Sequence, residues 1–320
     1  MARRHRPLLL LSAIMAVLTI ISLGGVLLDH RVLDGMPIWA KPLKFTVSFT
    51  VYGLTWAWLL SLRHRAPRWG WWLGTVLAIT SVVEVAVIIG QVVRGRRSHF
   101  NVSTPLDSSL FALMGATITI LMIANLVAAV LVLRERQADP VGTWAIRIGL
   151  VVSAAGLGLA ALMLPPTAAQ LADVATTVAG AHSVGVPDGG PGLPLIGWST
   201  TGGDLRVPHF VGMHALQVMP LLALLSRRIR NQAVRLRLVV IGGAGYAGLV
   251  ALVTWQALRG QPLLRPDGLT LGAAGLLMLG VAVAVRLTLR APARRSPRVA
   301  ATDVTAAPEP APEPSALETR

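Results

Sequence analysis

The chain of 320 residues has no cysteine and few charged residues for its length. Without cysteine, disulfide bonds, thiol nucleophiles and Cys-ligated metals are excluded. Charged residues make up 13% of the sequence and hydrophobic residues 54%, whereas roughly 25% of the residues of a soluble domain are charged. The apolar residues form long unbroken runs, and the mean hydropathy is +0.65. This composition excludes a large soluble domain and indicates a membrane protein.

Lysine is nearly missing as well, because Lys41 and Lys44 are the only two, while arginine is abundant and the formal net charge is +15. This preference is typical of a GC-rich coding sequence and favours a bacterial plasma membrane. The arginines fall in short clusters between apolar runs, as do topology determinants and contacts to anionic lipid head groups. We therefore expect the lipid bilayer and its anionic head groups as partners and no nucleic acid.

Eight apolar blocks are long enough to cross a bilayer, which takes about 20 helical residues. The predicted fold is therefore all-α, a polytopic transmembrane helix bundle of about eight spans. The blocks are Pro7–Leu28, Phe45–Leu62, Trp69–Val93, Ser108–Leu133, Ile148–Leu164, Pro208–Ser226, Leu238–Leu258 and Gly268–Val285. The first block is too long for a signal peptide and lacks a following cleavage motif, so we interpret it as a retained span.

The basic residues are distributed unequally between the two sides of the predicted bundle. With the N-terminus inside, and leaving out the terminal Arg320, the inner segments hold 19 Lys and Arg residues and the outer segments hold 9. This asymmetry predicts that both termini are cytoplasmic. Residues 1–290 are expected to form the transmembrane domain. Residues 291–320, which are basic and then rich in Pro, Glu and Ala, are expected to form a disordered cytoplasmic tail.

Polar side chains concentrate at the outer ends of the predicted helices. Four of these helices begin beside a proline, which suits the first helical position, and each N-terminus carries partial positive charge. Thr104 and Asp107 flank Pro105 as a typical helix cap. The basic residues near this rim are Lys41, Lys44, Arg94, Arg96, Arg97, His99 and Arg206. Together they predict an anion site, for which a phosphate-bearing lipid head group is the simplest ligand.

Glu84 is the only charged residue within the eight blocks, histidine aside. A carboxylate inside a span costs at least about 2.5–3.5 kcal/mol unless it is paired, protonated or hydrated, so it is a functional candidate. Gln91 lies on the same helix face, and His214 and Gln217 lie at a similar depth in the sixth block. His209 is predicted to point about 140° away from His214.

We predict that these four residues form a polar cluster beneath the basic rim. Glu84 and His214 are the candidate catalytic residues, and a purely structural hydrogen bond between them is the alternative. The candidate ligand-binding residues are Gln91, Gln217, Lys41, Lys44, Arg97, His99, Arg206 and His209.

No cofactor motif is recognisable, and the identity of any cofactor stays open. The spacing of His209 and His214 does not match that of zinc proteases. The sixth span is the only one of the eight that contains histidines, so two facing helices cannot supply the axial ligands of a bis-histidine haem. No metal site is predicted.

Three classes of function remain. The concentration of polar residues on the outer side favours an outward-facing site that binds or processes a small molecule or lipid head group. A proton- or cation-coupled transporter would need a path to the cytoplasm, for which Asn125 is the only obvious polar step. A non-catalytic scaffold would have Glu84 and His214 paired without a cavity. Whether the chain is an enzyme is left open.

Three segments on the outer side resemble a group of known sequences. They are Asp34–Phe45 (DGMPIWAKPLKF), Arg94–Asn101 (RGRRSHFN) and Gly203–Phe210 (GDLRVPHF). These stretches are similar to uncharacterised bacterial multi-pass membrane proteins of actinobacterial type. The resemblance extends over most of the chain up to the sixth span. It implies the same topology and carries no activity.

Overall fold

The computed structural model describes residues 5–63, 67–135 and 139–290, and the predicted tail at 291–320 lies outside these ranges. The described chain is all-α apart from two short antiparallel pairs of strands. The helices are α1 (Arg6–Leu28), α2 (Ala40–Ser61), α3 (Pro67–Val93), α4 (Pro105–Leu133), α5 (Pro140–Gly158), α6 (Ala168–Ala172), α7 (Arg206–Met213), α8 (Ala215–Leu225), α9 (Gln232–Leu258) and α10 (Gly268–Arg290). The strand pairs are β1 (Val32–Leu33) with β2 (Met36–Pro37), and β3 (Ser183–Val184) with β4 (Gly203–Asp204). Short 3₁₀ turns, η1 (Leu159–Met163) and η2 (Ser226–Arg228), follow α5 and α8.

Six of the described helical segments are long and apolar enough to cross a membrane, and the pair α7 and α8, bent by 44°, is a seventh candidate if the pair forms one span. The protein is therefore a multi-pass membrane protein. The predicted second span is helix α2, which has 22 residues but is not among these seven. Lys44 and several threonines lower the hydropathy of α2, and each hydroxyl of Thr46, Thr50 and Thr55 bonds to a carbonyl of its own helix.

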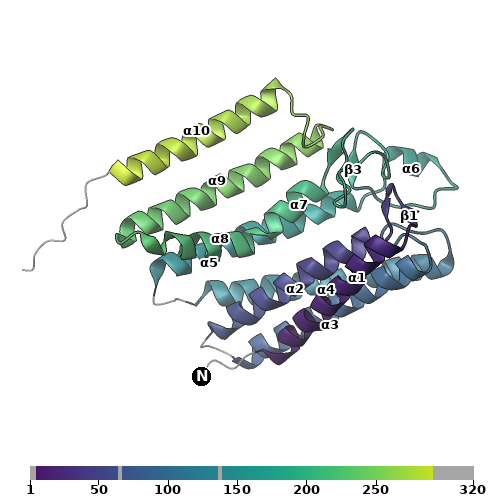
Figure 1. Cartoon of the computed structure of the whole chain (residues 1–320), viewed down its shortest axis with the longest axis horizontal. Coiled ribbons are helices and arrows are strands. Elements are labelled where there is room, and N and C mark those ends of the chain that lie inside the picture. The colour runs from purple at the N-terminus through teal and green to yellow at the C-terminus, as the bar shows by residue number, and fades with distance from the viewer. Residues whose placement is uncertain (1–4, 64–66, 136–138, 291–320) are drawn as a thin grey trace, which may run out of the picture.

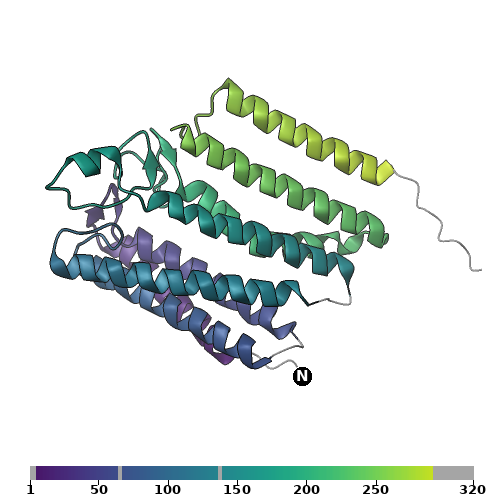
Figure 2. The same ribbon diagram turned by 180° about the vertical axis from the view of Figure 1, so that it is seen from behind.

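The long helices lie roughly side by side, and the two ends of the bundle differ in the segments that they carry (Figure 1). The start of α1 and the end of α10 lie at one end, which we call the termini end. The four strands, α6 and the long connecting segments gather at the other, which we call the loop end, and the reverse view shows the same arrangement (Figure 2). The sheets and loops therefore cover only the loop end.

The helices form two groups. In the first, α1 packs on α2 and α3 on α4; in the second, α5 contacts α7, α8 and α9, and α10 lies against α9. Contacts between α4 and α5 are few by comparison. Towards the termini end a shared apolar cluster joins the groups, including Leu121 and Ala128 of α4, Ile146 and Leu150 of α5, and Leu216 of α8. The two groups are thus joined by apolar contacts towards the termini end and are less tightly packed at the loop end.

Side-chain caps fix where several helices begin. The predicted cap of α4 is confirmed, because Thr104 Oγ1 accepts the backbone N–H of Asp107 and Pro105 occupies the first turn. Asp139 caps α5 and Asn231 caps α9 in the same way. These caps satisfy backbone groups that the helix itself leaves unpaired.

Two glycines permit a close crossing of α5 and α7. A Cβ atom added to Gly156 would lie 2.5 Å from the backbone nitrogen of Met213 and 2.6 Å from Cα of Gly212. The backbones therefore touch directly, as they do in other membrane helix pairs with small residues at the interface. This contact brings the carbonyl of Gly156 to 2.8 Å from Nδ1 of His209.

Candidate functional site

A cavity of about 370 Å³ lies between the two helix groups at the loop end. Its walls come from α2, α3, α4, α5, α7 and α8, and residues 178–206 contribute to its mouth. The volume falls in the range of about 300–1,000 Å³ that is usual for small-molecule sites. Nine of the ten candidate residues line it, namely Glu84, His214, Gln217, Lys41, Lys44, Arg97, His99, Arg206 and His209.

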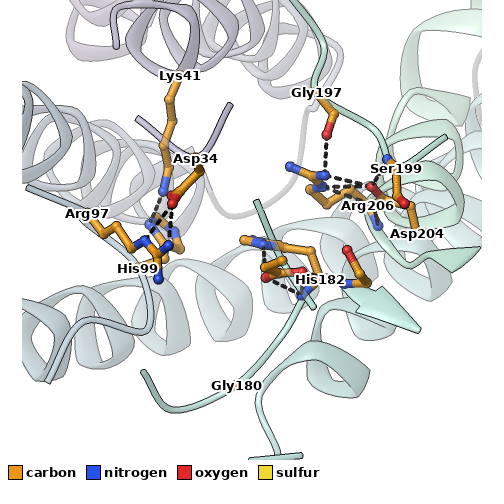
Figure 3. A network of polar contacts seen from close by, with 12 residues as sticks. Asp34, Lys41, Arg97, His99, Gly180, His182, Gly197, Ser199, Asp204 and Arg206 are labelled. Carbon is orange, nitrogen blue, oxygen red and sulfur yellow. Dashed lines mark hydrogen bonds and ion pairs between the residues drawn. The ribbon is translucent and has the colours of Figure 1, made fainter. Parts of the chain in front are cut away.

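Basic side chains surround the mouth in two groups that face each other (Figure 3). In the first group, Nζ of Lys41 lies 3.0 Å from Nδ1 of His99, and Oγ of Ser98 lies 3.2 Å from the same nitrogen. Arg97 donates from Nε to Oδ1 of Asp34 at 2.6 Å. This group joins the start of α2 to the segment between α3 and α4.

The second group is built around Arg206 at the start of α7. Its Nε and Nη2 bind the two carboxylate oxygens of the buried Asp204 at 2.9 and 2.6 Å, and Nη2 also donates to the carbonyl of Gly197. Lys44 donates to the neighbouring carbonyl of Ile196 at 2.6 Å. Arg206 and Lys44 thus hold the loop around residue 197 against the helices.

The basic residues of these groups differ in whether a carboxylate neutralises their charge. Arg97 and Arg206 are each paired with a carboxylate. Within the described ranges, Lys41 and Lys44 form no ion pair and hydrogen-bond only to a neutral imidazole and a carbonyl. The two lysines, together with the exposed Arg96, are therefore the Lys and Arg residues of the cavity that no carboxylate of the described chain pairs with.

Glu84 and His214 both line the cavity but hydrogen-bond to different partners. Glu84 is 2% exposed and accepts a 2.5 Å hydrogen bond from the hydroxyl of Thr117 on α4. His214 lies at the bend between α7 and α8 and binds the carbonyl of Phe210 through Nδ1 at 2.6 Å. The alternative of a direct structural hydrogen bond between Glu84 and His214 is therefore not formed.

Gln91 departs from the predicted cluster. It is buried, donates to Oδ1 of Asp107 at 2.9 Å and accepts a hydrogen bond from Arg94. Gln91 does share a buried helix face with Glu84, but it lies near the end of α3, where the start of α4 supplies a carboxylate. The prediction treated each helix alone and could not foresee this stronger partner.

His209 lines the same cavity as His214, although the two side chains were predicted to diverge by about 140°. That prediction assumed one continuous helix through both residues. The chain instead bends by 44° between α7 and α8. Gln217, on α8, donates to the hydroxyl of Thr55 at 3.2 Å and so links α8 to α2.

The deeper part of the cavity is mostly apolar. Phe45, Phe49 and Tyr52 form an aromatic stripe on α2, and the hydroxyl of Tyr52 donates to Asn125 at 2.9 Å. Ile118 of α4 and Leu164 after η1 line the cavity and are 40% and 59% exposed. Accessible apolar side chains therefore form part of the cavity wall.

The structure adds two residues to the site that the sequence did not single out. His182 lines the cavity and binds Oδ2 of Asp188 through Nδ1 at 2.9 Å. The same carboxylate accepts hydrogen bonds from the backbone N–H groups of His182 and Ser183 at 2.9 and 2.8 Å. The available signal was the length of the loop at residues 165–207, because long loops in compact proteins often carry function.

The protonation of these loop residues follows from their surroundings. Burial lowers the pKa of His182 and, to a greater extent, that of His99, where the nearby Lys41 adds repulsion. Burial opposes ionisation of Asp188, but hydrogen bonds from His182 and Ser183 outweigh it and hold the pKa of Asp188 below its usual range. At neutral pH these three residues are therefore two neutral imidazoles and one carboxylate.

No group of three or more His, Asp or Glu side chains in the described ranges is placed to hold a metal ion. In comparisons with known proteins, no family model matches the chain, and no curated protein or solved structure is significantly similar to it. The resemblance to actinobacterial-type membrane proteins therefore remains a prediction. The comparisons identify no family, and the fold and the site establish a multi-pass membrane protein with a basic cavity.

Proposed function

We propose that the loop-end cavity binds an anionic amphiphile, such as a phospholipid, with its head group at the basic mouth. The observation that carries this proposal is the presence of Lys41 and Lys44, which lack an ion-pair partner within the described chain, in a cavity with otherwise largely apolar deeper walls. Lysine is a common ligand for phosphate. A phosphate would supply the negative charge that these lysines lack.

The shape of the cavity supports an amphiphile over a fully polar anion. The apolar residues Ile118 of α4 and Leu164 after η1 border the cavity and keep accessible surface that an acyl chain can cover. The aromatic stripe of α2 offers further apolar surface below the lysines. An acyl chain would cover these surfaces while its head group stays at the mouth.

We further propose that the protein lies in a bacterial plasma membrane with about eight spans, including α2, and with both termini in the cytoplasm. The excess of Lys and Arg in the segments of the termini end supports this orientation. The cavity then opens towards the outer leaflet. The same polarity places the termini-end arginines beside the anionic lipids of the inner leaflet.

The floor of the cavity favours a binding or processing site over a transporter. Towards the termini end the apolar cluster around Leu121, Ala128 and Leu150 fills the space between the helix groups. Asn125, the expected polar step, is tied to Tyr52 at the floor. A polar path to the cytoplasmic side is therefore closed in this conformation.

Lipid retention tests the binding proposal. The protein is purified in mild detergent, and co-purifying lipids are measured by native mass spectrometry and phosphorus analysis. The double variant Lys41→Gln/Lys44→Gln is expected to lose most of the bound anionic lipid. The control Arg227→Gln/Arg228→Gln removes the same charge from exposed residues of η2 at the termini end. It measures the lipid lost through weaker contact with the bilayer surface alone, and this loss is expected to be much smaller. Equal retention by both double variants would contradict the proposal.

The orientation is tested directly because the chain has no cysteine. Single cysteines are introduced at Val174, a fully exposed residue of the loop end, and at Arg228 of the termini end. A membrane-impermeant maleimide added to intact cells is expected to label Val174→Cys and not Arg228→Cys. The reverse pattern would place the termini outside.

A further inference from the structure

Two imidazoles at the cavity mouth are held in opposite tautomers. His182 and His99 both contact Phe100, with ring centroids 4.9 and 6.3 Å from the phenyl ring. Both line the cavity, and His182 is placed between the two basic groups in Figure 3. The partners of each ring decide which of its nitrogens carries the proton.

His182 presents a lone pair to the cavity. Its Nδ1 faces the carboxylate of Asp188, which has only acceptors, so the proton must be on Nδ1. Nε2 is then unprotonated, and no described residue donates a hydrogen bond to it. The two backbone hydrogen bonds to Asp188 fix this carboxylate against the loop, so the orientation of the ring is fixed as well.

His99 presents the opposite group. Its Nδ1 faces Nζ of Lys41. When Lys41 is protonated its ammonium has only donors, so Nδ1 accepts and Nε2 carries the proton. The hydroxyl of Ser98 lies near the same acceptor nitrogen. Lys41 and His99 therefore offer an ammonium and an N–H donor on one side of the mouth, and His182 offers a base beside them.

We infer that His182 is a general base and that Lys41 and His99 stabilise the reacting anion in the hydrolysis of a phosphoric ester of the bound amphiphile. Nε2 of His182 takes a proton from water as the water oxygen bonds to phosphorus. The bond from phosphorus to the leaving alcohol oxygen breaks, and this oxygen takes a proton from the ammonium of Lys41. Exchange through solvent returns the proton from His182 to Lys41.

The overall reaction consumes one water and yields a phosphoric acid monoester and an alcohol. It requires no redox partner or co-substrate other than water. The inference rests on the proposed binding function, because Lys41 and Lys44 must first hold the phosphate.

The charge at the mouth favours a phosphoric ester over a carboxylic ester. Phosphoryl transfer spreads negative charge over several oxygens, and catalysis depends largely on cations and donors placed around them. The two lysines supply the positive charge, and the N–H groups of the paired Arg97 and Arg206 add donors in the same cavity. The carboxylates of Asp34 and Asp204 orient these arginines in the way that a neighbouring group preorganises a catalytic donor.

The experiment uses the full-length protein reconstituted in vesicles of phosphatidylglycerol and phosphatidylethanolamine. Phosphorus NMR and mass spectrometry follow the appearance of monoester and alcohol over time. The variants are His182→Gln and Asp188→Asn, and the matched control is His30→Gln, an exposed histidine of the loop end that does not line the cavity. Thermal unfolding and lipid retention are measured on each protein to confirm that it is folded and loaded.

The wild type and His30→Gln are expected to hydrolyse the lipid at equal rates. His182→Gln is expected to be slower by at least about 100-fold, the usual contribution of a general base. Asp188→Asn, which removes the carboxylate that fixes the tautomer, is also expected to be strongly impaired. The wild-type rate is expected to fall as the pH drops through the pKa of His182.

Two results would overturn the inference and leave the binding proposal standing. The first is a wild-type protein that retains lipid but releases no product. The second is a His182→Gln protein that retains lipid and reacts as fast as the wild type. Loss of lipid retention by the wild type itself would instead contradict the binding proposal, so the two failures are distinguishable.

Discussion

The close crossing of α5 and α7 gives a stability prediction whose size follows from the geometry. In Gly156→Ala the new Cβ would lie 2.6 Å from Cα of Gly212. Ordinary carbon contacts need about 3.5 Å, so the helices must separate by about 0.9 Å. The hydrogen bond from His209 to the Gly156 carbonyl, now 2.8 Å, would lengthen to about 3.7 Å, which is too long to count as a hydrogen bond.

The expected loss of stability combines three contributions. Overpacking a close contact costs about 1–3 kcal/mol, and the lost hydrogen bond about 0.5–1.5 kcal/mol. Replacing glycine by alanine inside a helix returns about 0.5–1 kcal/mol. We expect Gly156→Ala to lower the free energy of unfolding by about 1–3 kcal/mol, which corresponds to a fall of several degrees in the apparent Tm.

The matched control is Gly158→Ala, two residues further along α5, where an added Cβ meets no atom within 4 Å. This variant is expected to be unchanged or slightly more stable, because only the helix-propensity gain applies. Thermal unfolding of the detergent-solubilised proteins, followed by tryptophan fluorescence, measures both. Equal Tm values for the two variants would refute the close-contact reasoning.

Three further predictions concern charge. The pKa values of His99 and His182 are lowered from 6.5 in the folded protein, so as the pH falls the unfolded chain binds protons before the folded chain does. The free energy of unfolding therefore decreases below about pH 6.5, by at most about 1.4 kcal/mol per pH unit for each histidine. His99→Gln should flatten the Tm-against-pH curve. Asp107→Ala should lower stability by about 1.5–3 kcal/mol in denaturation assays, since the buried partners of this carboxylate lose an ionic acceptor. Asp204→Asn should raise anionic-lipid retention while lowering the Tm, because it frees the charge of Arg206.

Much of the fold follows from hydropathy and cap chemistry. The apolar blocks coincide with helices, and the cap at Thr104 is as predicted, because both signals are local in sequence. The boundary of α2 was less accessible, since Lys41 and Lys44 lie inside the helix and the predicted block began at Phe45. The bend between α7 and α8 was also missed, because it depends on tertiary packing.

The basic rim of the candidate site could be predicted from the sequence, whereas the hydrogen-bond partners of its residues were harder to predict. Lys41 and His99 stood out by charge at one end of the bundle, and the structure places them 3.0 Å apart at the nitrogen atoms. His182 and Asp188 were missed because their meeting depends on the path of a glycine-rich loop, which has no periodicity to read. Gln91 was assigned to the wrong cluster because the carboxylate that attracts it comes from another helix.

The sparse contact between the two helix groups has a consequence for assembly. Helices α1–α4 bury their faces mainly against one another, so this half has its own partners before α5 is synthesised. The cavity exists only once α5, α7 and α8 have docked, because its walls come from both halves. A molecule in the cavity therefore stabilises the association of the two halves. At a ligand concentration 100-fold above its Kd, the free energy of this association becomes more favourable by about 2.7 kcal/mol.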